Sequence, residues 1–182
     1  MSQESQPTSN SSNPSPYPLS ETETGFAFIT DRGAIYRLDF TSDSDYLPDT
    51  PFADSVYSFS ILPISGSFDR KDPRIEPTVV DAIGLLFEAI PQAVLIYVCS
   101  TEDDQELVRS RLFRQWFSRH KDAYTKFDFN YPQQRLYMSA IVRQDFPEKY
   151  QVELTILQAV EQAKWVTING SIAALKLLVY FE

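Results

Sequence analysis

Basic side chains concentrated in one segment are the feature of this sequence that could do chemistry. The 182-residue chain has sixteen Lys and Arg residues, and six of them fall within residues 109–126, where Asp122 is the only acidic residue. This segment therefore carries a charge near +5, whereas the remaining chain is near -14, which gives the net charge of -9. Because positions three apart share a side of a helix, Arg111 and Arg114 would project together. The candidate binding residues are Arg109, Arg111, Arg114, Arg119 and Lys121.

Two interpretations of this basic segment stay open. Its side chains could contact phosphate groups, with Trp116 and Tyr124 close enough in sequence to add ring contacts to a nucleic acid. They could instead form a solvated outer helix face whose arginines pair with acidic loops of the same protein. A pI of 4.6 argues against a dedicated nucleic-acid binder, which needs a basic face. We therefore favour the second interpretation.

Cys99 and His120 are the only residues of their types, which excludes an intramolecular disulfide and any multi-cysteine zinc site. Cys99 ends an apolar run just before a predicted helix, where a thiolate can be stabilised. The acidic residues 102–104 oppose that ionisation, so we expect a buried, structural thiol. His120 stands at the end of the same helix, where a cation complements the helix dipole.

Other polar groups indicate no catalytic set. Four aspartates of the loop 41–54 lack EF-hand spacing and indicate a solvated turn. Asp31, Asp69 and Asp72 stand near turns, which aspartate favours for its own backbone reasons. Five glycines supply no phosphate-binding loop. We therefore expect no catalytic residues, no metal and no cofactor, and the chain leans away from an enzyme.

The elements that would position these residues follow from hydrophobic periodicity. Phe26 and Phe28 share a face of one strand, and Gly33 suits the turn of a hairpin. Residues 93–99 are apolar throughout and predict a central strand covered on both faces. The predicted elements are a hairpin over 26–40, a strand over 55–64, a helix over 79–90, a strand over 93–99, a helix over 102–120, a hairpin over 125–142 and a helix over 148–164.

Two of these segments are ambiguous. Residues 148–164 alternate like a strand in their first half, at Tyr150, Val152, Leu154 and Ile156, but Gln, Glu, Ala and Lys near the end favour a helix. Residues 171–182 could form a short helix or an edge strand. For the helix over 102–120, we expect Ser100 or Thr101 to serve as the N-cap. The order βββ-α-β-α-ββ-α predicts an α+β fold, a mostly antiparallel sheet of about six strands packed against helices.

The first 24 residues contain seven serines and four prolines and few apolar groups. Such a segment cannot bury enough surface to offset the entropy of ordering it, so we expect a disordered tail over 1–24 and a single domain over 25–182. The tail lacks the features of a secretory signal or a transit peptide, and no apolar run approaches the length of a membrane span. We expect a cytoplasmic protein.

Several motifs occur together along the chain. They are the hairpin F-x-F-x-T-D-x-G-x-x-Y-x-x-x-F over 26–40, Asp72-Pro-Arg-Ile75 before Thr78-Val-Val80, Tyr97-Val-Cys99, Asp103-Asp104, and the Arg-rich run 109–117. Together they resemble a family of small cytoplasmic proteins of unknown function from Bacteroidetes-type bacteria. The resemblance covers about residues 25–160. It implies fold boundaries and a bacterial origin, and no activity, cofactor or catalytic residue.

These observations predict a non-enzymatic protein-interaction or regulatory module whose partner is another protein. Support comes from the missing catalytic set and from the 14% of aromatic residues. The alternative is nucleic-acid or phosphate binding through the helix residues 109–121. No membrane partner is expected, and the oligomeric state stays open.

Overall fold

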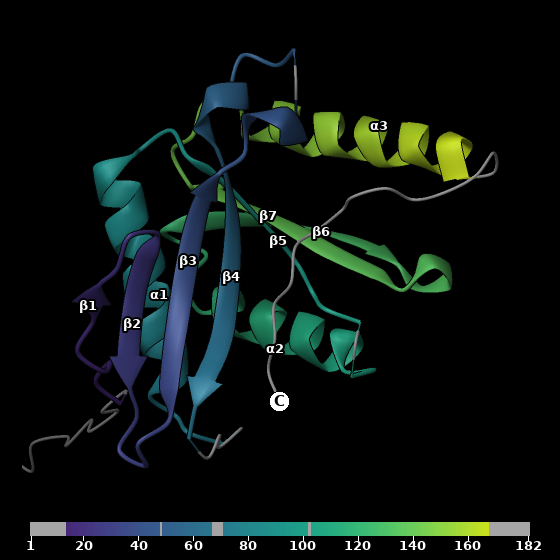
Figure 1. The fold of residues 1–182 in the computed structure, drawn as a ribbon. Helices are drawn as coiled ribbons and strands as arrows, with labels where there is room; N and C mark the ends of the chain where they lie inside the picture. The colour runs from purple at the N-terminus through teal and green to yellow at the C-terminus, as the bar shows by residue number, and fades with distance from the viewer. Residues whose placement is uncertain (1–13, 48, 67–70, 102, 168–182) are drawn as a thin grey trace, which may run out of the picture.

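The computed structural model describes residues 14–47, 49–66, 71–101 and 103–167. They form an α+β fold with one seven-stranded, mostly antiparallel sheet and three α-helices, which confirms the predicted fold class (Figure 1). The strands are β1 (Ser20–Glu21), β2 (Gly25–Ile29), β3 (Ile35–Ser42), β4 (Val56–Ser65), β5 (Val94–Val98), β6 (Tyr124–Tyr131) and β7 (Leu136–Arg143). The helices are α1 (Ile75–Ala89), α2 (Glu106–Ser118) and α3 (Lys149–Thr167).

The strand order is β1-β2-β3-β4-β5-β7-β6, so β1 and β6 are the two edges. Only β4 and β5 pair in parallel, because α1 connects them and returns the chain to the same end of the sheet. The predicted hairpins β2–β3 and β6–β7 are both present. The β6–β7 ladder is regular over eight residue pairs, from Tyr124↔Arg143 to Tyr131↔Leu136.

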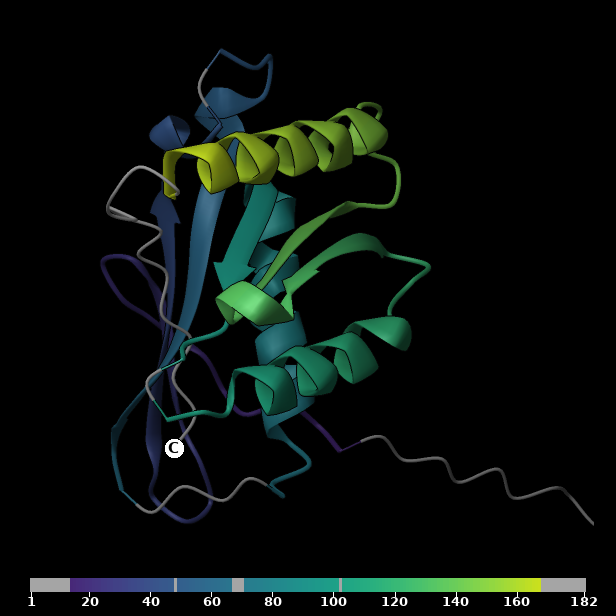
Figure 2. The same ribbon diagram turned by 90° about the vertical axis from the view of Figure 1, so that its right-hand side faces the viewer.

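Each face of the sheet has its own core. Figure 2 shows α2 and α3 on opposite sides of the β6–β7 pair. Helices α1 and α2 pack on one face, where Leu95 and Tyr97 of β5 point. Helix α3 covers the other face, where Val94, Ile96 and Val98 point. All five residues of β5 are buried, which confirms a central strand covered on both sides.

Both helices on the first face begin at other positions than predicted. Helix α1 starts at Ile75, four residues before the predicted start at residue 79. Helix α2 starts at Glu106, and its N-cap Gln105 makes no side-chain capping bond, so the predicted cap at Ser100 or Thr101 is wrong. The physical reason is that Asp103 instead accepts the backbone N–H of Gln105 and binds Arg109, which keeps residues 103–105 out of the helix.

Helix α3 settles the ambiguity of residues 148–164 in favour of the predicted helix. The strand-like alternation has a simple cause. At about 100° per residue, the buried side chains Val152 and Ile156 lie nearly opposite the exposed Tyr150 and Leu154. A helix that is apolar on two opposite faces shows apolar residues at every second position over a short stretch.

The fold begins before Gly25, although residues 1–24 were expected to be a disordered tail. The Tyr17 side chain is only 4% exposed and stacks on Phe28, with ring centroids 5.8 Å apart. Its hydroxyl donates to Asp72 (2.8 Å), and the guanidinium carbon of Arg74 lies 3.9 Å from its ring centroid. Arg74 also donates to the carbonyls of residues 15 and 16. Residues 14–19 therefore form an arm that is tied to α1 and leads into β1.

Some predictions concern residues that the structure does not describe. Residues 1–13 of the expected tail and the final segment 171–182 lie outside the described ranges. Within those ranges, no helix combines the length and apolar composition that crossing a membrane requires.

Candidate functional site

Arg109 holds the loop before α2 and is not part of an exposed basic face. Its side chain is 2% exposed, although the sequence placed it among the binding candidates. The guanidinium donates to both carboxylate oxygens of Asp103 and to the carbonyl of Ser100 (2.9 Å). The hydrogen bond from Arg109 lowers the pKa of Asp103. A buried arginine is tolerated because these partners replace the lost water.

A second arginine, Arg135, fastens the same loop from the β6–β7 turn. It adopts a left-handed conformation (φ 52°) and donates to Glu106 (2.8 and 3.1 Å), to Asp104 and to the carbonyl of Thr101 (3.0 Å). Hydrogen bonding from Arg135 lowers the pKa of Glu106, whose side chain is mostly buried. The two arginines thus fix the start of α2 against the β6–β7 hairpin.

Polar side chains of β6 and β7 form a network beneath α2. Arg114 reaches Asp128 from α2 (Nε to Oδ2, 3.1 Å), and its side chain stays 55% exposed. Lys126, whose side chain is 8% exposed, pairs with the same carboxylate and donates to Ser139 (3.1 Å). Burial lowers the pKa of Lys126. Every charge in this network has a partner inside the protein, so the network is a structural anchor for α2.

Tyr97 of β5 and Cys99, which directly follows β5, are both buried in the core beneath α1 and α2. Burial raises the pKa of the Cys99 thiol to about 12, against the opposing effect of the Arg109 charge. A thiol with such a pKa is not a nucleophile at neutral pH. Burial raises the pKa of the Tyr97 hydroxyl well above its usual value. Neither group is accessible for chemistry.

The structure does not bring the five predicted basic residues together. Arg119 pairs with Glu76 of α1 (3.1 Å), and His120 lies two residues beyond the last residue of α2. Arg111 and Lys121 are exposed, and the described residues include no ion-pair partner for either. Arg109, Arg114 and Arg119 pair with carboxylates of the same chain, but Arg109 is buried and not on an outer helix face, and the partners of Arg114 and Arg119 lie in β6 and α1 and not in loops.

The free edge of β6 is the most distinctive surface of the molecule. Gln144 donates its backbone N–H to Ala123, which identifies residues 123, 125, 127, 129 and 131 as those whose backbone groups face β7. The N–H and C=O groups of Lys126, Asp128 and Asn130 therefore point away from the sheet. No other described segment pairs with this edge. Three residues thus present unpaired backbone donors and acceptors along one line.

Side chains of opposite character flank this edge. On the α2 side, Arg114 contacts Asp128 of β6, and Arg111 lies one turn earlier on the same side of the helix. On the α3 side, the 66%-exposed Tyr150 packs edge-on against Phe127 of β6, with ring centroids 6.4 Å apart. We call the outward backbone of β6 together with Arg111, Arg114, Phe127 and Tyr150 the β6 edge site.

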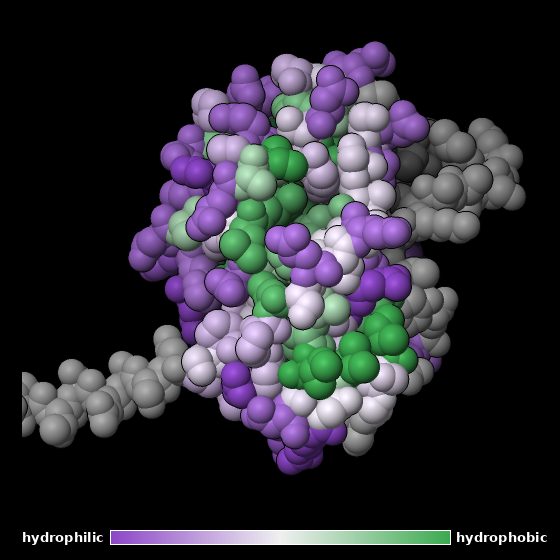
Figure 3. Space-filling view, turned by 60° about the vertical axis from the view of Figure 1, so that its left-hand side comes forward, coloured by the Kyte–Doolittle hydropathy of each residue, from purple (hydrophilic) through white to green (hydrophobic). Residues whose placement is uncertain are grey.

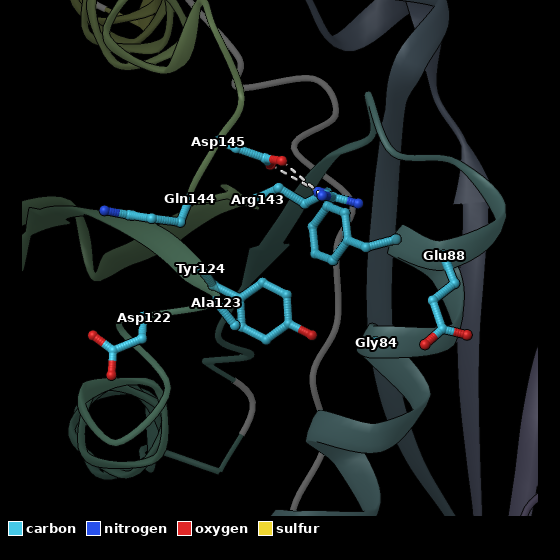
Figure 4. A pocket seen from close by; sticks show the side chains of 9 residues that line it. Gly84, Glu88, Asp122, Ala123, Tyr124, Arg143, Gln144 and Asp145 are labelled. Atoms are coloured by element: carbon cyan, nitrogen blue, oxygen red, sulfur yellow. Dashed lines mark hydrogen bonds and ion pairs between the residues drawn. The ribbon is translucent and has the colours of Figure 1, made fainter.

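A recess of about 470 Å³ opens between the C-terminal half of α1 and the β6–β7 pair (Figure 4). Its lining includes Tyr124, Arg143 and Asp145, and the guanidinium of Arg143 is held by Asp145 at 2.8 and 2.7 Å. Burial raises the pKa of Tyr124, so this hydroxyl stays protonated at neutral pH. The recess is lined by side chains of both charges. None of its lining residues is activated as a general acid or base or as a nucleophile.

Apolar side chains are also exposed on strands far from the β6 edge site. Ile29 at the end of β2 and Ile64 near the end of β4 are more than half exposed, and Figure 3 shows hydrophobic side chains gathered in the lower part of that view. β2 and β4 are interior strands of the sheet, although the pairing of β2 with β1 ends at Ala27 and the pairing of β4 with β5 ends at Ser58. The β6 edge site differs in that its outward backbone groups lie along a complete edge strand of the sheet.

Comparison with known proteins assigns no chemistry to these features. Residues 71–148 match a family described as a family of unknown function (DUF6169). The matched segment contains α1, β5, α2, β6 and β7, and so includes most of the β6 edge site. This finding supports the family resemblance for that segment only. No curated protein matches the sequence.

Sequence reasoning identified Arg111 and Arg114 but missed the edge beside them. The hairpin over 125–142 was predicted, and its alternation showed which side chains share a face. The order of strands in a sheet depends on long-range pairing, which no local pattern encodes. The predicted hairpin alone could not show that β7, and not β6, pairs with β5.

Proposed function

We propose that this protein is an interaction module that binds an extended segment of another protein by adding it as a strand along β6. One observation carries the proposal: Lys126, Asp128 and Asn130 direct their backbone N–H and C=O groups outward from an edge strand of eight residues. Such an edge is a template for an incoming strand, and main-chain hydrogen bonds then supply affinity.

The regularity of β6 supports this proposal. Proteins usually protect an edge strand by keeping it short or by placing proline, a bulge or a charged side chain, especially lysine, in it. β6 contains no proline and its ladder with β7 has no irregularity. Lys126 is charged, but Asp128 already neutralises it, so an added strand would bury no new unpaired charge.

Phosphate or nucleic-acid binding through residues 109–121 has weaker support. Arg109 is buried, and Arg114 and Arg119 pair with carboxylates of the same chain. A nucleic-acid interface needs several cations free to replace counterions. For the proposed interaction module we expect a bacterial origin and a cytoplasmic location, which the family resemblance implies.

The experiment compares two substitutions of Asn130, whose side chain is exposed. Asn130→Pro removes one outward N–H without touching the β7 ladder, whereas Asn130→Ala removes the side chain and keeps that N–H. A library of linear peptides displayed on phage is selected against the immobilised full chain. Selected peptides are then titrated against wild type and both variants, and urea unfolding checks that the variants fold.

Strand addition predicts that peptides selected on wild type bind Asn130→Ala similarly and bind Asn130→Pro about tenfold more weakly. The reason is that an unpaired carbonyl in the complex costs about 1–3 kcal/mol. Equal binding to wild type and folded Asn130→Pro, or no enrichment of any peptide, would overturn the proposal.

A further inference from the structure

An added strand would present alternate side chains to two different surroundings. Successive side chains of a strand point to opposite faces of the sheet, so every second residue of the segment would face α2 and the others would face α3. At the β6 edge these two sides differ in charge and in polarity. The surroundings therefore restrict which residue types the partner can carry, both at the positions that face α2 and at those that face α3.

The α2 side carries positive charge. Arg111 is exposed without an ion-pair partner among the described residues, and Arg114 uses its Nε on Asp128 while more than half of its side chain stays exposed. Lys126 and Asp128 on β6 neutralise each other. This side is thus locally basic on a molecule whose net charge is -9. A carboxylate placed there would be attracted by the charges of Arg111 and Arg114.

The α3 side is apolar. Tyr150 is 66% exposed and Leu154 is 53% exposed, and helical spacing places both on one stripe with Leu157. Tyr150 contacts Phe127 of β6, so this stripe begins directly beside the edge strand. A surface helix normally turns polar residues to solvent. Apolar side chains of an added strand would cover Tyr150 and extend the core on this face.

We infer that the segment bound at the β6 edge site alternates acidic residues, which face Arg111 and Arg114, with aliphatic or aromatic residues, which face Phe127 and Tyr150. This inference rests on the proposed strand addition and names the chemistry of its partner. The acidic positions supply specificity and the apolar positions supply buried surface.

Three synthetic peptides of about the length of β6 test the inference. They alternate valine with glutamate, with glutamine or with lysine, and each is titrated against the full chain at low and at high salt. We expect the Val–Glu peptide to bind about tenfold more tightly than the Val–Lys peptide, and we expect added salt to reduce that difference. Equal affinities for the three peptides would overturn the inference.

Matched variants show which side chains of the protein produce the difference in peptide affinity. Arg111→Gln should weaken the Val–Glu peptide about two- to fivefold, whereas Lys121→Gln, which removes the same charge from the far end of the segment, should not. Tyr150→Ser should weaken all three peptides by a similar factor, because it acts on the apolar side. An equal loss with Arg111→Gln and Lys121→Gln would show a general charge effect and overturn the assignment.

The outcomes separate this inference from the proposed function. If Val–Gln or Val–Lys peptides bind best and still lose affinity with Asn130→Pro, strand addition stands and the acidic partner is wrong. If no peptide is sensitive to Asn130→Pro, strand addition fails as well. A single-stranded oligonucleotide that binds wild type but not Arg111→Gln, while the peptides do not bind, would overturn both in favour of the basic helix.

Discussion

The two edges of the sheet are built in opposite ways. β1 has two residues, follows two prolines at positions 16 and 18, and continues an arm that Arg74 and Tyr17 tie to α1. β6 has eight residues, is regular throughout, and presents its outward backbone groups to no described segment. The comparison teaches that this fold protects one edge of its sheet and leaves the other available.

The protection of the β1 edge can be broken at Tyr17. We expect Tyr17→Ala to lower the free energy of unfolding by about 3 kcal/mol, because the ring packs in the core against Phe28. It should also release the arm, expose the edge of β2 and cause concentration-dependent association. Urea unfolding and light scattering measure these effects.

Tyr17→Phe is the matched control for that variant. It keeps the stacked ring and loses the hydrogen bond to Asp72, so we expect a loss of about 1 kcal/mol and no association. A Tyr17→Ala protein with wild-type stability and size would show that the arm does not protect this edge.

Arg109 positions α2 beside the open edge. We expect Arg109→Met to lower the free energy of unfolding by about 2 kcal/mol, because Asp103 and the Ser100 carbonyl lose their donor. The exposed Arg111→Met should change stability by less than about 0.5 kcal/mol. Equal unfolding midpoints of the two variants in urea would contradict the described roles of these arginines.

Acid should lower the free energy of unfolding because it protonates Glu106, which pairs with Arg135 beside β6. Its pKa is lowered in the folded protein, so its pairing with Arg135 stabilises the fold above the usual carboxyl pKa and loses this effect as pH falls below about 4.5. Glu106→Gln should lower stability by about 1 kcal/mol at neutral pH and reduce the fall in acid. Urea midpoints between about pH 7 and pH 3 test this; an unchanged slope would show that Glu106 does not contribute.

The smallest expected effect is the alkylation of the Cys99 thiol, which is buried beneath α2. Because burial raises the pKa of this thiol to about 12, the folded protein should resist iodoacetamide at about pH 8 and react only after unfolding in urea. Mass spectrometry reports the modification. Rapid alkylation of the folded protein would show that α2 opens readily and that the β6 side is more dynamic than its ion pairs suggest.

Local patterns in the sequence predicted most of the elements. The apolar run that became β5 and both hairpins were identified because side-chain periodicity is a property of neighbouring residues. The start of α2 was misplaced because Asp103 binds Arg109, a partner six residues away, and does not cap a helix. The arm around Tyr17 was missed because a single aromatic side chain among prolines gives no periodic signal.

The candidate site was predictable only in part. Arg111 and Arg114 were identified from charge alone, but so was Arg109, which is buried. A charge run indicates a surface, yet it cannot distinguish an arginine that faces solvent from one that ties a loop. Tyr150 and Leu154 were noted only as part of an alternating pattern. The sequence does not show which face of α3 packs on the sheet, and so it could not show that these two side chains are exposed.

By itself the sequence determined the periodicities, and through them the strands, the helices and the α+β class, since these depend on short-range geometry. Only the tertiary structure decided that β7 pairs with β5 and leaves β6 at the edge, that Arg109 is internal, and that Tyr17 belongs to the core. Those outcomes depend on contacts between residues far apart in the chain, which are selected by packing and by the pairing of buried polar groups.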